Sequence, residues 1–378
     1  MYHVKTMNKI SKIGLAELDD RFAISDTMEH EDAILVRSAK LHDYDFPAEL
    51  KCIARAGAGV NNIPLDRAAD AGIVVFNAPG ANANGVKELT IAALLLASRK
   101  ISQGITWVKE QSAAGADVAA VVEKGKSAYV GPEIQGKTLG VVGLGAIGVL
   151  VANAAAALGM KIVGYDPFLS VTHALNLTPG VEVVDTLPEL YAKADYISLH
   201  LPMNDATRGT LNEAAFAAMK DGVRIVNLAR GELVDTPALK AALDSGKCAA
   251  YVTDFPNSET AAMEGVVAIP HLGASTPESE DNCAMMAARE VKEYLDNGSI
   301  INSVNLPNLT MAWAAKTRVC VISKGADAAA IAGAVPAVAS ASNTRGEYAY
   351  TILDTDAAVD EAAIAAIPGV LRVRVLTR

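Results

Sequence analysis

Short runs of β-branched and apolar residues alternate with helix-compatible stretches along the first ninety residues of the chain. The apolar runs are, in order, YHVKTM, AILVRSA, CIARAG and IVVFNAPG. Alternation of this kind is typical of a parallel sheet covered by helices, and it predicts a first α/β domain. A long helical region is expected from about residue 85 to residue 110, followed by a weakly patterned Ala/Gly-rich stretch to residue 127.

A second series of six apolar runs begins near residue 136, at the spacing of β-α units. The runs are KTLGVVGLG, KIVGYD, YISLHLP, VRIVNLA, CAAYVTDF and GVVAIPH, and they predict a second parallel sheet. A helix is expected over residues 282–295, and INSVNLPNLT, with its proline, indicates a linker. From about residue 317 the order of strand, helix, strands, helix and strand predicts a small α+β module.

Composition narrows the class of protein. A chain of 378 residues suggests two or three domains. Its formal net charge of −10 and its pI near 5.2 argue against the basic surface that binds nucleic acid. We therefore expect neither nucleic acid nor a membrane as a partner, and no metal site. The four cysteines have no paired spacing and no targeting or spanning segment is evident, so a reduced, cytoplasmic protein is expected.

The segment LGVVGLGAIG carries Gly143, Gly145 and Gly148 in G-x-G-x-x-G spacing, directly between an apolar run and a helical stretch. Such a turn lets backbone amides at a helix N-terminus approach a pyrophosphate. The following run ends in Asp166, which would accept hydrogen bonds from both hydroxyls of an adenine ribose. A carboxylate repels a 2′-phosphate, so NAD is expected rather than NADP. The plainer interpretation is a glycine turn that only packs a strand on a helix.

Three residues with complementary chemistry follow three successive apolar runs, namely Arg230, Glu259 and His271. Oxidation of a 2-hydroxy acid by hydride transfer needs a base, a cation for the carboxylate, and a carboxylate that orients the base. His271 suits the first task, Arg230 the second and Glu259 the third. Separately, the same residues are consistent with a strand-end cap, a helix-edge ion pair and a solvated loop charge.

The motifs GLGAIG, NLARGELVDTPAL, TDFPNSE and IPHLGAST resemble those of the D-isomer-specific 2-hydroxyacid dehydrogenases, and the resemblance covers about residues 3–307. LVRSAKLHDYDF, IARAGAGVNNI and VVFNAPGANANGVKEL are similar to the branch of this family that acts on 3-phosphoglycerate. The resemblance implies two Rossmann/flavodoxin-like domains. These are a substrate-binding domain of residues 1–92 and 282–306 and an NAD-binding Rossmann domain of residues 93–281, followed by an ACT-like regulatory module of residues 317–378.

The resemblance also implies roles for individual residues. Arg230, Glu259 and His271 would be catalytic. Besides the glycine turn and Asp166, cofactor contacts are implied for Ala146, Ile147, His200, Leu201, Pro202, Ala229, Asp254, Gly273 and Ala274. Substrate contacts are implied for Arg37, Ser38, Arg55, Gly57, Ala58, Gly59, Val60 and Asn82, with Lys87 either a further cation or a solvated helix charge. Many relatives carry Arg where this chain has Ala146, so a reduced affinity for NAD is expected.

Two other functions stay open at this point. A dehydrogenase of an unphosphorylated 2-hydroxy acid, such as glycerate or lactate, would use the same three residues without Arg37 and Arg55. An NAD-sensing binding module would need the glycine turn and Asp166 but no proton-transfer pair. The expected partners are 3-phosphoglycerate, a second copy of the chain in a homodimer or homotetramer, and serine as a candidate effector, although the segment between the first two strands of the tail is short.

Overall fold

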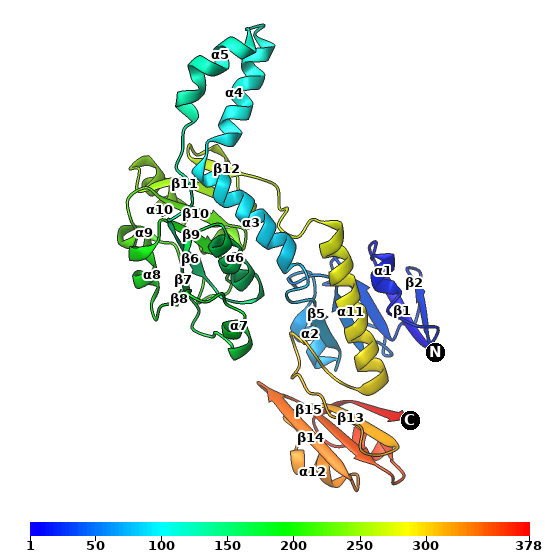
Figure 1. Cartoon of the computed structure of the whole chain (residues 1–378). Coiled ribbons are helices and arrows are strands. Elements are labelled where there is room, and N and C mark those ends of the chain that lie inside the picture. Colours follow the sequence, from blue (N-terminus) through cyan, green and yellow to red (C-terminus); the bar gives the residue numbers. More distant parts are fainter. The chain divides into compact units, whose positions relative to one another are not determined.

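The computed structural model describes all 378 residues and divides into two compact units (Figure 1). The first unit consists of Met1–Asn82 and Pro277–Arg378, and the second of Ala83–Thr276. Each unit contains a parallel sheet, and the first also holds a small antiparallel sheet, so the expected α/β class with a small C-terminal module is confirmed. No helix has both the length and the apolar character that a bilayer crossing requires.

The parallel sheet of the first unit has the strand order β2-β1-β3-β4-β5, which is the flavodoxin-like order. Its strands are β1 (Tyr2–Met7), β2 (Phe22–Ser25), β3 (Ala33–Val36), β4 (Cys52–Arg55) and β5 (Val74–Asn77). The central strand β3 is buried along its whole length, which explains its unbroken apolar run. Strand β2 at the edge was not expected from the sequence, because its four residues are only partly buried apart from Phe22.

Helices α1 (Lys12–Leu15) and α2 (Leu65–Asp70) flank this sheet together with the long helix α11 (Pro277–Asn297). The expected bounds of 282–295 were too short, because α11 begins with Pro277 and carries acidic residues in its first turn. Along α11, Cys283, Ala287, Val291 and Leu295 recur every four residues and are all buried. This stripe packs on the sheet in one hydrophobic core.

The small sheet of the first unit has four antiparallel strands in the order β14-β15-β13-β16. Its elements are β13 (Thr317–Lys324), α12 (Ala328–Gly333), β14 (Ala339–Arg345), β15 (Tyr348–Thr355), α13 (Glu361–Ala365) and β16 (Val370–Thr377). Strand β14 was not recognised in the sequence, because most of its residues are exposed and polar. In chain order β14 is the second strand of this sheet, and it lies in the segment after β13 that looked short in the sequence.

Two buried arginines tie the small sheet to α11. Arg374 donates to the carbonyls of Tyr294 and Leu295 at 3.0 and 2.9 Å, in the last turn of the helix. Arg318 forms an ion pair with Asp354 at 2.8 Å, with both side chains fully buried, and donates to the carbonyl of Asn297. The small sheet therefore supplies hydrogen-bond donors to the last carbonyls of α11, of which that of Tyr294 also accepts from the N–H of Gly298 and that of Leu295 from the hydroxyl of Tyr2.

The second unit has a seven-stranded parallel sheet in the order β12-β11-β10-β9-β6-β7-β8, which is the Rossmann order with one further strand. Its strands are β6 (Thr138–Val142), β7 (Lys161–Tyr165), β8 (Glu182–Val183), β9 (Tyr196–Leu199), β10 (Val223–Asn227), β11 (Cys248–Thr253) and β12 (Val266–Ala268). All six strands expected from the sequence are present. Only the two-residue strand β8 was missed.

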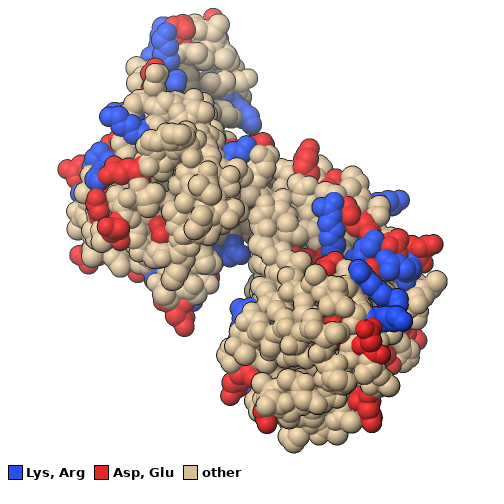
Figure 2. Space-filling view, turned by 60° about the horizontal axis from the view of Figure 1, so that its bottom comes forward, with Lys and Arg blue, Asp and Glu red and all other residues tan.

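The helices of this unit are α3 (Ala83–Ser98), α4 (Ile101–Ala113), α5 (Val118–Gly125), α6 (Ala146–Ala157), α7 (Val171–Leu175), α8 (Leu187–Lys193), α9 (Glu213–Ala218) and α10 (Thr236–Asp244). The long helical region expected from about residue 85 to residue 110 is present as the two helices α3 and α4, because the chain breaks between them at Arg99 and Lys100. The stretch taken as weakly patterned contains α5. On the face drawn in Figure 2, acidic and basic side chains are interspersed over both units.

Candidate active site

The glycine turn lies between β6 and α6, where the sequence predicted it. Gly143 has a φ of +94°, and a Cβ there would lie 2.5 Å from the carbonyl oxygen of His200. A Cβ on Gly148 would lie 1.9 Å from the carbonyl oxygen of Gly143. At Gly145, by contrast, a Cβ would meet no atom within 4 Å. Two glycines are therefore required by packing, and the third borders open space next to the N-terminus of a twelve-residue helix.

Asp166 follows β7 and lies beside this turn. Its carboxylate accepts hydrogen bonds from the backbone N–H of Leu144 at 2.9 Å and of Phe168 at 2.8 Å. These two bonds hold the carboxylate against the turn and leave further lone pairs for a ligand. In the first turn of α6, Ala146 is exposed and Ile147 partly buried, so this part of the turn carries no cation.

The three proposed catalytic residues follow three adjacent parallel strands. Arg230 comes after β10, Glu259 after β11 and His271 after β12, and β11 pairs with both of the other strands. Carboxyl ends of parallel strands meet at one edge of a sheet, which is where ligands bind in this architecture. The structure therefore brings all three residues to the same edge.

A buried amide fixes the backbone at Arg230. Asn227, which is fully buried, accepts from the N–H groups of Ala229 and Arg230 and donates to the carbonyl of Arg230 at 2.8 Å. One terminal nitrogen of the guanidinium donates to the carbonyl of Ala229. The remaining N–H groups of the guanidinium can donate two parallel hydrogen bonds to a carboxylate.

Phe255 contacts both Arg230 and His271. Its ring centroid lies 4.3 Å from that of His271, and the guanidinium carbon of Arg230 lies 5.3 Å from it. Sequence reasoning missed this residue, although its position directly after Asp254 at the end of β11 was a usable signal. The ring limits the orientations open to both functional side chains.

Glu259 and His271 share the sheet edge but are not joined by a hydrogen bond or by an ion pair within 4.0 Å. Both side chains are exposed. The backbone N–H of Glu259 donates to Asn257, at the start of the 3-10 helix η3 (Thr260–Ala262). Catalytic hydrogen bonds are often loose without substrate, so their pairing stays a prediction.

Asp254 is 1 % exposed and lies next to His271. Burial raises the pKa of its carboxyl, while the N–H of Gly273, which donates at 3.0 Å, and the charge of His271 act in the opposite direction. The other carboxylate oxygen, Oδ1, is buried without any partner. A buried acceptor without a donor costs stability, and an amide of a bound dinucleotide would supply one. The residues present therefore fit an NAD group.

The remaining predicted cofactor residues lie on the same side of the second unit. His200 follows β9, its Nε2 lies 2.9 Å from the hydroxyl of Ser198, and burial lowers its pKa to about 4. The imidazole is therefore neutral near pH 7. Leu201 borders Gly143, and the others lie at strand ends, namely Pro202, Ala229, Gly273 and Ala274. No group of three or more His, Cys, Asp or Glu side chains is arranged to bind a metal ion.

The predicted substrate residues lie in the first unit. Arg37 pairs with Glu280 at 2.7 Å, and Arg55 donates to the carbonyls of Arg37 and Gly59. The guanidinium of Arg55, at the end of β4, therefore lies against the backbone of Arg37, which directly follows β3. The loop of Gly57, Ala58, Gly59 and Val60 follows Arg55, Ser38 follows Arg37, and Asn82 lies just before α3. Lys87 belongs to α3 in the second unit, where it pairs with Glu88 at 3.6 Å.

Comparisons with known proteins found a matching family and matching relatives. Residues 91–273 match the family described as D-isomer specific 2-hydroxyacid dehydrogenase, NAD binding domain. The D-3-phosphoglycerate dehydrogenase of Methanocaldococcus jannaschii is 35 % identical over 315 residues, which are 81 % of this chain and 58 % of that protein. The chain thus spans little more than half the length of the curated relatives it matches.

Against solved structures, by contrast, the match extends over nearly the whole length of the solved chain. The apo form of D-mandelate dehydrogenase from Rhodotorula graminis matches with a TM-score of 0.67 and 26 % identity, over 82 % of this chain and 99 % of that one. The NAD+-bound 3-phosphoglycerate dehydrogenase of Entamoeba histolytica matches with a TM-score of 0.61 and 25 % identity, over 82 % and 99 %. Residues 91–273 of the chain therefore belong to the NAD binding domain family of the D-isomer-specific 2-hydroxyacid dehydrogenases.

Proposed function

We propose that this chain catalyses the NAD-dependent oxidation of D-3-phosphoglycerate to 3-phosphohydroxypyruvate. The observation that carries the proposal is the contact of both Arg230 and His271 with the ring of Phe255, at a strand edge next to a dinucleotide turn. Curated relatives at 35 to 40 % identity carry the name D-3-phosphoglycerate dehydrogenase, which supports the substrate.

Each residue at this edge has a part in the reaction. Arg230 binds the substrate carboxylate through two parallel hydrogen bonds and so orients the adjacent carbon. His271 accepts the proton of the substrate hydroxyl at a ring nitrogen as the hydrogen on that carbon leaves as hydride. Glu259, when its side chain turns to the imidazole, stabilises the charged ring. NAD, when bound, would supply the hydride acceptor, and Asp254 would hold it through the carboxylate oxygen that has no partner.

Arg37 and Arg55 are proposed to bind the phosphate of the substrate. A dianion held by two guanidinium groups gains several charge-assisted hydrogen bonds. One observation favours a second candidate, an unphosphorylated 2-hydroxy acid: Arg37 is already paired with Glu280, and Arg55 donates to two carbonyls. The similarity to D-mandelate dehydrogenase points the same way.

Initial rates of NADH oxidation separate these functions. The substrates are 3-phosphohydroxypyruvate, hydroxypyruvate and glyoxylate, and the variants are His271→Ala, Arg37→Ala and, as a control on an exposed histidine, His42→Ala. We expect a preference for the phosphorylated substrate, a loss of roughly 100- to 10,000-fold in kcat for His271→Ala, and no effect for His42→Ala. Arg37→Ala should raise KM for 3-phosphohydroxypyruvate alone.

Contrary results would redirect the assignment. Equal rates with hydroxypyruvate, unchanged by Arg37→Ala, would favour the unphosphorylated substrate. Binding of NADH without turnover of any keto acid would favour the sensing module. Sedimentation would test the proposed homodimer or homotetramer, and repeating the assay with serine would test the small sheet as an effector module. The four buried, free cysteines are consistent with a reducing, cytoplasmic environment.

A further inference from the structure

Three buried polar side chains lie together beneath the loops that carry Arg230 and Phe255. Asn227 ends β10 and Thr253 ends β11, and these two residues pair directly in the sheet of the second unit. Tyr251 precedes Thr253 by two residues, so both side chains lie on the same face of that sheet. Asn227 and Thr253 are fully buried, and Tyr251 is 2 % exposed.

The phenol of Tyr251 joins the two strand ends through hydrogen bonds. Its oxygen accepts from the side-chain amide of Asn227 at 3.0 Å. Burial raises the pKa of this phenol, while hydrogen bonds with the side chains of Thr253 and Asn227 act in the opposite direction. One hydroxyl therefore connects the last residue of β10 with the last residue of β11.

Each end of this network holds the backbone of a loop at the proposed active site. On the side of β10, the amide oxygen of Asn227 accepts from the N–H groups of Ala229 and Arg230 at 3.1 and 3.3 Å, and its nitrogen donates to the carbonyl of Arg230 at 2.8 Å. With the bond to Tyr251, both donors and both lone pairs of the Asn227 amide are used.

On the side of β11, the hydroxyl of Thr253 accepts from the backbone N–H of Phe255 at 3.0 Å. The ring of Phe255 contacts both Arg230 and His271. The network therefore reaches, in a chain of buried hydrogen bonds, from the backbone of Arg230 to the backbone of the residue on which its guanidinium rests.

The hydroxyl of Tyr251 is not needed to fill the core. The ring belongs to one apolar cluster with Leu199, Ile225 and Leu233, where phenylalanine would occupy the same volume without a polar atom to bury. A buried polar network whose members are all satisfied makes the segments that it joins rigid. Rigidity matters here because a misplacement of about 1 Å at a reacting group can lower a rate by roughly 100-fold.

We propose that Tyr251 is a positioning residue for the proposed reaction. Through Asn227 its hydroxyl fixes the backbone from which Arg230 binds the substrate carboxylate, and through Thr253 it fixes the backbone of Phe255. The inference rests on the role proposed above for Arg230, and it adds a residue that lies beneath the site.

Tyr251→Phe removes the hydroxyl and keeps the ring, and Tyr196→Phe is its matched control. Tyr196 is 1 % exposed at the start of β9 in the same sheet, and its hydroxyl bonds to that of Ser98 at 2.8 Å, at the end of α3. Each variant loses one buried hydroxyl. Only Tyr251→Phe should raise KM for the keto acid that the wild type reduces best, by at least about fivefold, while Kd for NADH stays within about twofold.

Thr253→Val and Thr253→Ser provide a second pair of variants, which also carries the test if Tyr251→Phe does not fold. Thr253→Val removes the next hydroxyl of the network at nearly constant shape and should raise KM in the same way. Thr253→Ser keeps the hydroxyl and should restore the KM of the wild type. The effects of Tyr251→Phe and Thr253→Val should not add in the double variant, because either change breaks the same connection.

Amide hydrogen exchange of the full chain, measured by mass spectrometry, needs no turnover. Peptides that contain residues 229–230 and residue 255 should exchange at least about tenfold faster in Tyr251→Phe than in the wild type, and at the wild-type rate in Tyr196→Phe. The proposal is overturned if exchange in either peptide is unchanged in Tyr251→Phe. It is also overturned if KM of Tyr251→Phe is no higher than that of Tyr196→Phe.

The proposed function can fail separately. A wild type that binds NADH and reduces none of the three keto acids would overturn that function, and hydrogen exchange would still decide whether Tyr251 holds the two loops.

Discussion

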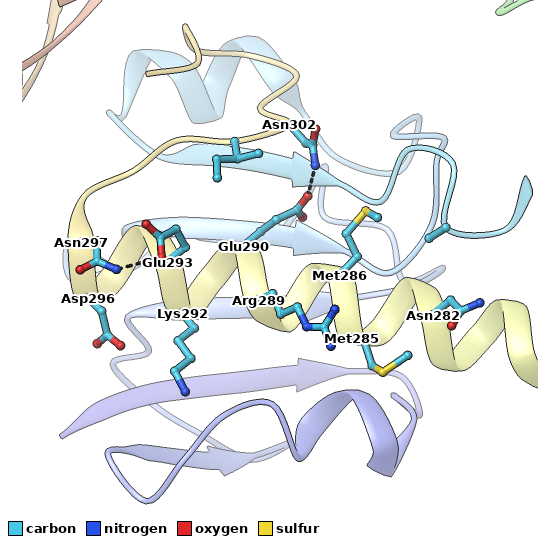
Figure 3. A pocket seen from close by; sticks show the side chains of 12 residues that line it. Asn282, Met285, Met286, Arg289, Glu290, Lys292, Glu293, Asp296, Asn297 and Asn302 are labelled. Atoms are coloured by element: carbon cyan, nitrogen blue, oxygen red, sulfur yellow. Dashed lines mark hydrogen bonds between the residues drawn. The ribbon is translucent and has the colours of Figure 1, made fainter. Parts of the chain in front are cut away.

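Replacing Glu290 by glutamine should change how the stability of the protein depends on pH. This residue of α11 is 5 % exposed, and its Oε1 accepts from the side-chain amide of Asn302 at 2.7 Å (Figure 3). Burial raises the pKa of this carboxyl from its ordinary 4.5 to about 8. Between these values the folded chain keeps a proton that the unfolded chain has lost. The neutral acid therefore contributes stability that is fully present below about pH 4.5 and is lost as the pH rises through about 8. The difference between the folded and the unfolded pKa corresponds to a loss of at most about 5 kcal/mol of stability, at about 1.4 kcal/mol for each pKa unit.

Glutamine has nearly the same shape, keeps an oxygen to accept from Asn302, and cannot ionise. The unfolding free energy of Glu290→Gln minus that of the wild type should therefore increase with pH, by up to about 5 kcal/mol between about pH 5 and pH 9. Urea unfolding followed by circular dichroism across this range measures the difference, and taking the difference cancels groups such as His200 that titrate in both proteins.

The exposed Glu278 provides the control, because Glu278→Gln should run parallel to the wild type at every pH. A Glu290→Gln curve that also runs parallel to the wild type would refute the reasoning. It would mean that the carboxyl is hydrated and ionised in the folded protein.

Three further predictions concern the proposed active site and the docking of the small sheet. Phe255→Ala should lower kcat/KM roughly tenfold or more and alter its pH profile, because the imidazole of His271 loses its contact; Phe255→Tyr should restore both, and an unchanged pH profile would remove Phe255 as a positioning residue. Asp166→Ser should raise the ratio of kcat/KM for NADP to that for NAD, and a constant ratio would contradict its place at the ribose. Arg374→Met should destabilise the protein by about 2–5 kcal/mol, measured as a lower Tm, because two buried hydrogen bonds to carbonyls of α11 are lost; an unchanged Tm would show that water replaces the guanidinium.

Much of the proposed site could be located from sequence because its signals are local. A glycine turn between a strand and a helix needs only neighbouring residues to be recognised, and the structure gives the reason for its spacing in the close approaches of Gly143 and Gly148. The end of an apolar run also marks a strand end, so Arg230 and His271 could be assigned to one sheet edge before any coordinates were known. Their roles remain predictions.

Other features could not be found in this way. Strand β14 is exposed and polar, so it lacks the apolar pattern that identifies strands; only its pairing with β15 defines it. The partner of Arg37 is Glu280, which is far away in the chain and reaches it through the return of α11 to the first unit. No periodicity predicts such a contact.

The sequence by itself determined the class of fold, the order of the β-α units and the dinucleotide turn, since each depends on the periodicity and backbone preferences of adjacent residues. Only the tertiary structure decided which side chains lost their water. In AAREVKEYLDN, Glu290 looks like one more charge on the polar face of a helix. The loop that carries Asn302 buries it, and desolvation, which depends on segments packed from elsewhere in the chain, turns an ordinary carboxylate into a neutral acid.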